Sequence, residues 1–122
     1  MSDDEKREKG RALARKLFEG AEARGSGGPL PDALAEDTMT HLFGDVWQRD
    51  DEMSLEEREL ITSTVLVALG REPELHLHFV AARNVGIPRK KIEGMITHVA
   101  HYAGWPVAVS ASRVLNEVWP AE

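Results

Sequence analysis

The sequence predicts an all-α fold of about six helices, formed by one domain over residues 1–122. Apolar residues recur at spacings of three and four within segments rich in Ala, Leu, Glu, Lys and Arg. Pro73, Pro88 and Pro106 each stand where a first helical turn would begin, which is the position that proline tolerates best. No alternating apolar and polar segment longer than a few residues indicates a strand.

The first expected helix covers residues 3–23. It carries Leu13, Leu17 and Phe18 at helical spacing, so this helix needs a neighbour that covers its apolar face. The segment 25–31, Gly-Ser-Gly-Gly-Pro-Leu-Pro, interrupts the helical pattern. We expect it to be a mobile linker.

The remaining helices begin and end at recognisable capping residues. Asp32 is suited to cap the second helix. Ser54-Leu-Glu-Glu57 is a capping box, in which each of the two side chains accepts a hydrogen bond from the other residue's backbone N–H, and the third helix then ends at Gly70. The expected helices span about 3–23, 32–49, 54–69, 73–85, 88–103 and 106–119.

Composition excludes several functional classes. The chain carries 21 acidic residues against 15 Lys and Arg, a net charge of −6, which disfavours binding to nucleic acid or to an anionic membrane surface. No apolar run approaches the ~20 residues of a transmembrane helix. The charged N-terminus lacks the apolar core of a signal peptide, so a cytoplasmic location is expected. Because the chain has no cysteine, thiol peroxidase chemistry is excluded.

The fourth expected helix carries two histidines on different faces. His78 follows Leu75 and precedes Phe79 on one apolar stripe, so it points with the core side chains. His76 lies about 200° from His78 around the helix, so the two imidazoles cannot chelate one metal ion from an intact helix.

The fifth expected helix carries two further histidines off its core stripe. His98 and His101 lie about 60° apart, with Gly94 between them on the same face. This face is suited to line a cleft or a subunit contact. The same pair could supply two ligands to Zn²⁺, but the spacing reveals no third ligand, and we predict no metal site.

The third expected helix has a polar patch formed by Glu59, Thr62 and Ser63. It lies opposite the apolar Ile61 and Val65.

Several short motifs follow one another over most of residues 10–118. They are Phe43-Gly-Asp-Val-Trp-Gln-Arg49, Arg58-Glu-Leu-Ile-Thr62, Ala68-Leu-Gly-Arg71, Glu74-Leu-x-x-His78, Gly86 and His98-x-x-x-Tyr-x-Gly-x-Pro106. This ordered set resembles the carboxymuconolactone decarboxylase family. The resemblance implies an all-α fold built on a helical hairpin, and assembly as a homotrimer or homohexamer. One branch of the family is an alkylhydroperoxidase that uses a Cys-x-x-Cys pair. The other branch decarboxylates γ-carboxymuconolactone in aromatic catabolism without metal or cofactor.

The resemblance favours the decarboxylase branch. The two cysteine positions of the peroxidase branch fall at Arg71 and Glu74, neither of which can form a sulfenate or a disulfide. His78 matches the family's histidine, and Glu59 matches a glutamate of its proton relay. One departure is Gly94, which stands where many decarboxylase-like members have a glutamate.

By this resemblance, the chain is expected to be a lyase that acts on a carboxylated lactone, a small-molecule carboxylate, and needs no cofactor. Arg71 and Arg58 would anchor the substrate carboxylate, since a guanidinium is a planar, two-pronged cation. His78 would act as the acid–base group, Glu59 would orient it, and His98 would form a second polar wall.

An alternative of a different class stays open. A non-catalytic oligomeric module could use the same fold to bind a small aromatic acid or a protein partner, and Gly94 and the absent cysteines favour this alternative. The two hypotheses differ at His78, which a catalyst would place near Arg and Glu side chains with solvent access. A scaffold would instead seal it among core side chains. Under either hypothesis the apolar stripe of the last helix suggests contact with another copy.

Overall fold

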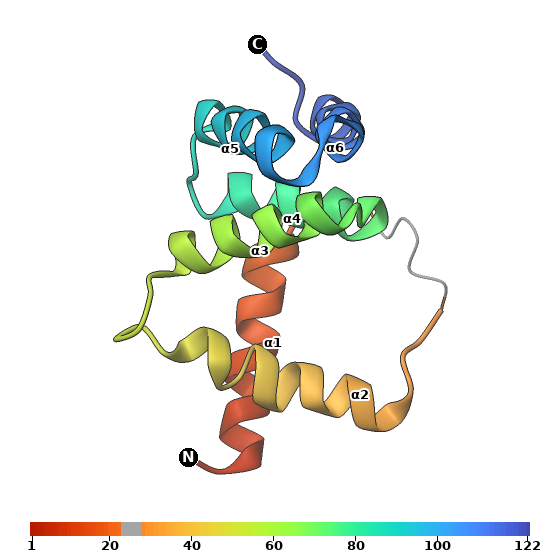
Figure 1. Cartoon of the computed structure of the whole chain (residues 1–122). Coiled ribbons are helices and arrows are strands. Elements are labelled where there is room, and N and C mark those ends of the chain that lie inside the picture. The colour runs from red at the N-terminus through yellow and green to blue at the C-terminus, as the bar shows by residue number, and fades with distance from the viewer. Residues whose placement is uncertain (23–27) are drawn as a thin grey trace.

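The computed structural model describes residues 1–22 and 28–122, and in these two ranges the chain is helical and contains no strand (Figure 1). The predicted all-α fold is confirmed. Residues 25–27 of the predicted linker lie outside the described residues. No helix of the two described ranges combines the length and the apolar character needed to span a bilayer. The α-helices are α1 (Asp3–Phe18), α2 (Asp32–Asp37), α3 (Leu55–Leu69), α4 (Glu72–Asn84), α5 (Arg89–Ala103) and α6 (Trp105–Val118).

Helix α4 lies at the centre of the packing. It forms a hairpin with α3, and it also packs against α6 and α1. In Figure 1 α5 and α6 lie above this hairpin, while α1 runs steeply toward it from the N-terminus below. The tight hairpin turn requires Gly70, whose φ of 71° is in the left-handed region that favours glycine.

The main core is formed by α3, α4, α5 and α6. Its buried side chains alternate with exposed polar residues at helical spacing, as the sequence predicts. The apolar stripe of α6 is mostly covered within the chain. The largest fully buried side chains of this core are Val67, Leu75, Phe79, Ile92 and Val114.

A smaller core lies between α1, α4 and the segment after α2. It contains Leu17, Phe43, Trp47 and Ala81, with Phe18 packed partly against it. Helix α4 therefore contributes to both cores, through Ala81 to the smaller core and through its opposite side to the main one.

Helix α1 crosses the following segment at a very short distance. A Cβ atom added at Gly10 would lie 1.9 Å from the carbonyl oxygen of Met39, and one added at Gly44 would lie 2.2 Å from that of Lys6. Both distances are far below van der Waals contact. Only glycine allows the two backbones to approach this closely, so these two residues fix where α1 lies.

The second helix differs from the prediction of one helix over residues 32–49. It ends at Asp37, and the chain continues as a π-helical turn, η1 (Thr38–Leu42), and a short 3₁₀ turn, η2 (Val46–Gln48). The hydroxyls of Thr38 and Thr40 donate to the carbonyls four residues earlier, at 2.7 and 2.8 Å. Such bonds compete with the regular helical ladder and bend it. Periodicity alone could not reveal this interruption.

The end of α1 also differs from the predicted residue 23. The helix stops at Phe18 because Gly20 adopts a φ of 80°, which is outside the helical region. The amide Nδ2 of Asn84 then donates to the carbonyl oxygens of Leu17 at 2.8 Å and Glu19 at 2.9 Å. A side chain of α4 thus satisfies two terminal carbonyls of α1 and attaches the two helices to each other.

Candidate functional site

A carboxylate and an imidazole meet at the interface of α3 and α4. Nδ1 of His78 lies 2.9 Å from Oε1 and 3.1 Å from Oε2 of Glu59. The Glu59 side chain is 0% exposed, while that of His78 is 14% exposed. The hydroxyl of Ser63 donates to Oε2 of Glu59 at 2.9 Å. Two residues predicted for the site are thereby in direct contact, and Ser63 joins them.

Local sequence explains why these groups face each other. The predicted capping box is present at the start of α3, where Ser54 and Glu57 each accept from the other's backbone N–H. With the helix start fixed, Glu59 and Ser63 are four residues apart and share its buried face. On α4, His78 lies between the side that serves the smaller core and the side that serves the main core.

The contact fixes which ring nitrogen of His78 faces Glu59. An ionised carboxylate only accepts hydrogen bonds, so with Glu59 in that form Nδ1 of His78 carries the proton and donates it. The other ring nitrogen, Nε2, is then left for a ligand, as an acceptor when the ring is neutral and as a donor when it is charged. A buried carboxylate that fixes the tautomer of a partly exposed imidazole is a common arrangement for a general acid or base.

One side of the His78 imidazole is apolar. The Phe18 ring, from the end of α1, lies at 5.3 Å between ring centroids and is perpendicular to the imidazole. Phe18 in turn contacts Phe43 at 6.0 Å, and Phe43 contacts Trp47 at 5.6 Å. Sequence reasoning placed Phe18 on an apolar face but did not connect it with His78. No local signal could have done so, because the contact joins residues that are far apart in the chain.

Arg58 is buried but is directed toward another part of the chain. Its side chain is 7% exposed, and its Nη2 donates to the carbonyl oxygen of Arg49 at 3.0 Å and to Oε1 of Glu52 at 3.1 Å. Within the described residues, its Nε is buried and has no hydrogen-bond partner. Arg58 therefore attaches the loop before α3 to that helix and has one donor left unused.

Arg71 and His98 are not assembled with His78 in this chain. Arg71 precedes α4, is exposed, and donates through Nε to Glu74 at 2.8 Å. His98 is exposed on α5, where its ring packs on that of Tyr102 at 4.8 Å. Of the five predicted site residues, the structure thus brings Glu59 and His78 together and places the other three elsewhere.

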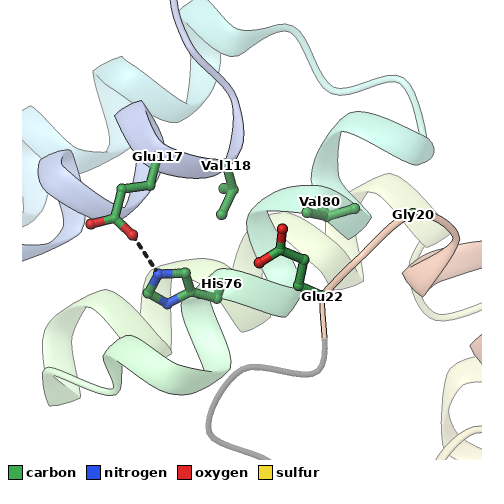
Figure 2. A pocket seen from close by; sticks show the side chains of 6 residues that line it. All are labelled: Gly20, Glu22, His76, Val80, Glu117 and Val118. Atoms are coloured by element: carbon green, nitrogen blue, oxygen red, sulfur yellow. Dashed lines mark hydrogen bonds and ion pairs between the residues drawn. The ribbon is translucent and has the colours of Figure 1, made fainter.

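His76, on the same helix as His78, has partners of its own. His76 approaches the carbonyl oxygen of Glu72 through Nδ1 at 3.0 Å and Oε2 of Glu117 through Nε2 at 2.8 Å. Figure 2 shows this contact at the edge of a cavity of about 150 Å³. Across the described residues, no group of three or more His, Asp or Glu side chains is arranged to hold a metal ion. The cavity is lined by Gly20, Glu22, His76, Val80, Glu117 and Val118.

A comparison with known protein families identifies the family of this chain. Residues 32–117, from the start of α2 to the last turn of α6, match the model of the carboxymuconolactone decarboxylase family. The chain belongs to this family. It is similar to the 4-carboxymuconolactone decarboxylase of Acinetobacter baylyi, with 38% identity over 77 residues. The similar stretch covers 63% of this chain and 57% of the length of that relative.

Proposed function

We propose that the chain is a cofactor-independent decarboxylase that acts on a carboxylated lactone such as γ-carboxymuconolactone. The observation that supports this proposal is the contact between buried Glu59 and partly exposed His78, within the region that matches the family. Of the features expected of a catalyst at His78, a neighbouring carboxylate and partial solvent exposure are present, whereas Arg58 and Arg71 contact other residues.

The pair is suited to the proton step of such a reaction. When the bond between the lactone ring and its carboxylate breaks, CO₂ leaves and the electron pair passes into the unsaturated lactone. The charged imidazole of His78 then gives its Nε2 proton to the ring carbon, while Nδ1 keeps its hydrogen bond to Glu59. Solvent returns a proton to Nε2. Glu59 stabilises the charged imidazole before this transfer.

The substrate carboxylate needs a cation before it leaves. Arg58 is the proposed anchor, because it lies on the same turn of α3 as Glu59 and has a buried Nε without a partner in the described part of the chain. Arg71 and His98 stay predicted substrate contacts. Single Arg71→Ala and His98→Ala variants test them by an increased KM.

The decisive experiment measures CO₂ release from γ-carboxymuconolactone by the wild type, His78→Asn and His76→Asn. His78→Asn should lower kcat by about 10²-fold or more, the usual scale of general acid catalysis. His76→Asn is the matched control, since it removes an imidazole of the same helix whose carboxylate partner is on α6. Equal rates in the wild type and His78→Asn would overturn the assignment. No turnover by the wild type, with saturable binding of an aromatic acid, would instead support the non-catalytic module.

We also propose that the chain acts as a homotrimer or homohexamer. Several large apolar side chains stay exposed on one face of α3 and near the start of α6, including Leu69 at 68% and Trp105 at 61%. Exposed apolar patches of this kind commonly mark protein contacts. Light scattering should give three or six times the mass of one chain, and Leu69→Lys should reduce it. A wild-type monomer at micromolar concentration would contradict this proposal. The other exposed residues of this surface are Ile61, Val65 and Val109.

A further inference from the structure

The end of α1 contributes an apolar wall beside His78 that the function proposed above does not use. The Phe18 ring is perpendicular to the imidazole at 5.3 Å between centroids. The polar partner of Nδ1 is Glu59, which accepts a second hydrogen bond from Ser63, and both of these residues are fully buried. Phe18 and His78 are each partly exposed and their rings are in contact, so a ligand that reaches the imidazole would come close to the Phe18 ring.

The position of this ring is fixed from two directions. Asn84 donates to the carbonyl oxygens on either side of Phe18, at 2.8 and 2.9 Å. On the other side the ring contacts Phe43, which is only 6% exposed. A large aromatic ring held in this way is a rigid surface with a defined shape and not a loosely placed side chain.

Phe18, which forms this wall, lies outside the residues that match the family model. The match begins at residue 32, whereas α1 ends at Phe18. The polar groups of the pair come from α3 and α4, inside the match. The chemistry and the apolar boundary of this site are therefore supplied by different parts of the chain.

We infer that Phe18 is a specificity-determining residue, which limits the size of the ring substituent that a carboxylated cyclic substrate can carry next to His78. This inference rests on the proposed function for its substrate class. A rigid apolar wall excludes an added group by steric overlap and favours a flat, unsubstituted ring by contact area. Removal of the ring enlarges the space beside the imidazole and leaves Glu59, Ser63 and His78 in place.

The first test does not depend on turnover. Diethyl pyrocarbonate acylates accessible imidazole nitrogens, and peptide mass spectrometry gives the rate at each histidine. In Phe18→Ala, the rate at His78 should rise toward that at exposed His98, whereas the rate at His98 stays at its wild-type value. Leu13→Ala is the matched control, because Leu13 packs against the same small core from the same helix but has no ring contact with His78.

The second test uses the proposed substrate and a ring-methylated analogue. The ratio of kcat/KM for the analogue to that for the parent lactone should rise about 10-fold in Phe18→Ala, a usual value for one methyl group in an apolar pocket. Phe18→Leu, which keeps most of the apolar volume, should give a smaller rise and serves if the alanine variant does not fold.

The outcomes distinguish failure of the inference about Phe18 from failure of the proposed function. An unchanged labelling rate at His78 in a cooperatively folded Phe18→Ala protein, or an equal increase in Leu13→Ala, overturns the inference. So does an unchanged selectivity ratio in an active Phe18 variant. If the wild type does not turn over either lactone but labelling at His78 rises in Phe18→Ala alone, the wall is supported and the decarboxylase assignment fails.

Discussion

The contact between Glu59 and His78 should be measurable as a coupling free energy. His78→Ala removes the N–H donor and leaves a carboxylate that is 0% exposed with Ser63 as its hydrogen-bond donor. Breaking a buried pair by removing one partner costs about 3–5 kcal/mol in the free energy of unfolding. Glu59→Gln keeps the shape and one acceptor oxygen, so it should cost about 1–3 kcal/mol.

The double variant decides whether the two effects share one cause. A neutral amide at position 59 needs no charged donor, so His78→Ala should destabilise the Glu59→Gln protein much less than it destabilises the wild type. We expect a coupling of about 1.5–3 kcal/mol, the range of a hydrogen bond to a charged group. The contact with Phe18 is lost equally in both proteins that carry Ala at position 78, so it cancels in the cycle.

The assay is urea unfolding followed by far-ultraviolet circular dichroism at pH 7 for the four proteins of the cycle. His76→Ala is the control, because its partner Glu117 is half exposed, and such pairs contribute about 0–1 kcal/mol. Additive single effects would refute the reasoning. A His78→Ala protein as stable as His76→Ala would refute it as well.

Two further predictions concern the supporting fold. Gly10→Ala should destabilise the protein strongly, since its Cβ would lie 1.9 Å from the Met39 carbonyl oxygen, whereas Gly94→Ala meets no atom within 4 Å and should stabilise an exposed helix by about 0.5–1 kcal/mol. Thermal unfolding of both variants checks this pair, and equal melting temperatures would contradict it. The hydrogen bond from the Ser54 backbone N–H lowers the pKa of Glu57 below its usual 4.5. Its contribution to stability is therefore present above pH 4.5 and lost as the pH falls through the lower folded-state pKa. The stability difference between the wild type and Glu57→Gln should accordingly disappear at strongly acidic pH; a difference that grows on acidification would contradict this sign.

The sequence predicted on which helix faces the site residues lie, but it did not predict the contact between Phe18 and His78. The spacing of Leu75, His78 and Phe79 predicted that the imidazole points with the core, and Glu59 and Ser63 belonged to one predicted polar patch. Both statements depend only on helical periodicity, which the structure preserves. The contact of Phe18 with His78 depends on where α1 crosses, and periodicity carries no information on this.

The errors of the sequence analysis have the same origin. One helix was predicted over residues 32–49 because its apolar spacing is regular, but the threonine side chains and Gly44 interrupt it. The contacts of Arg58 with the loop before α3 were likewise not predicted from the sequence. A charged side chain can reach in several directions from one helical position, so its partner is decided by tertiary structure.

The division of the interior into two cores has a consequence for how the protein opens. Stability within a domain is distributed over cooperative units, and a unit with fewer buried apolar contacts opens at a lower free energy. Here the smaller core joins α1 to the segment around Phe43 and Trp47, and it meets the main core along α4. Release of α1 would uncover His78 without separating α3 from α4. Access to the imidazole and the orientation of the imidazole therefore depend on different contacts of the fold.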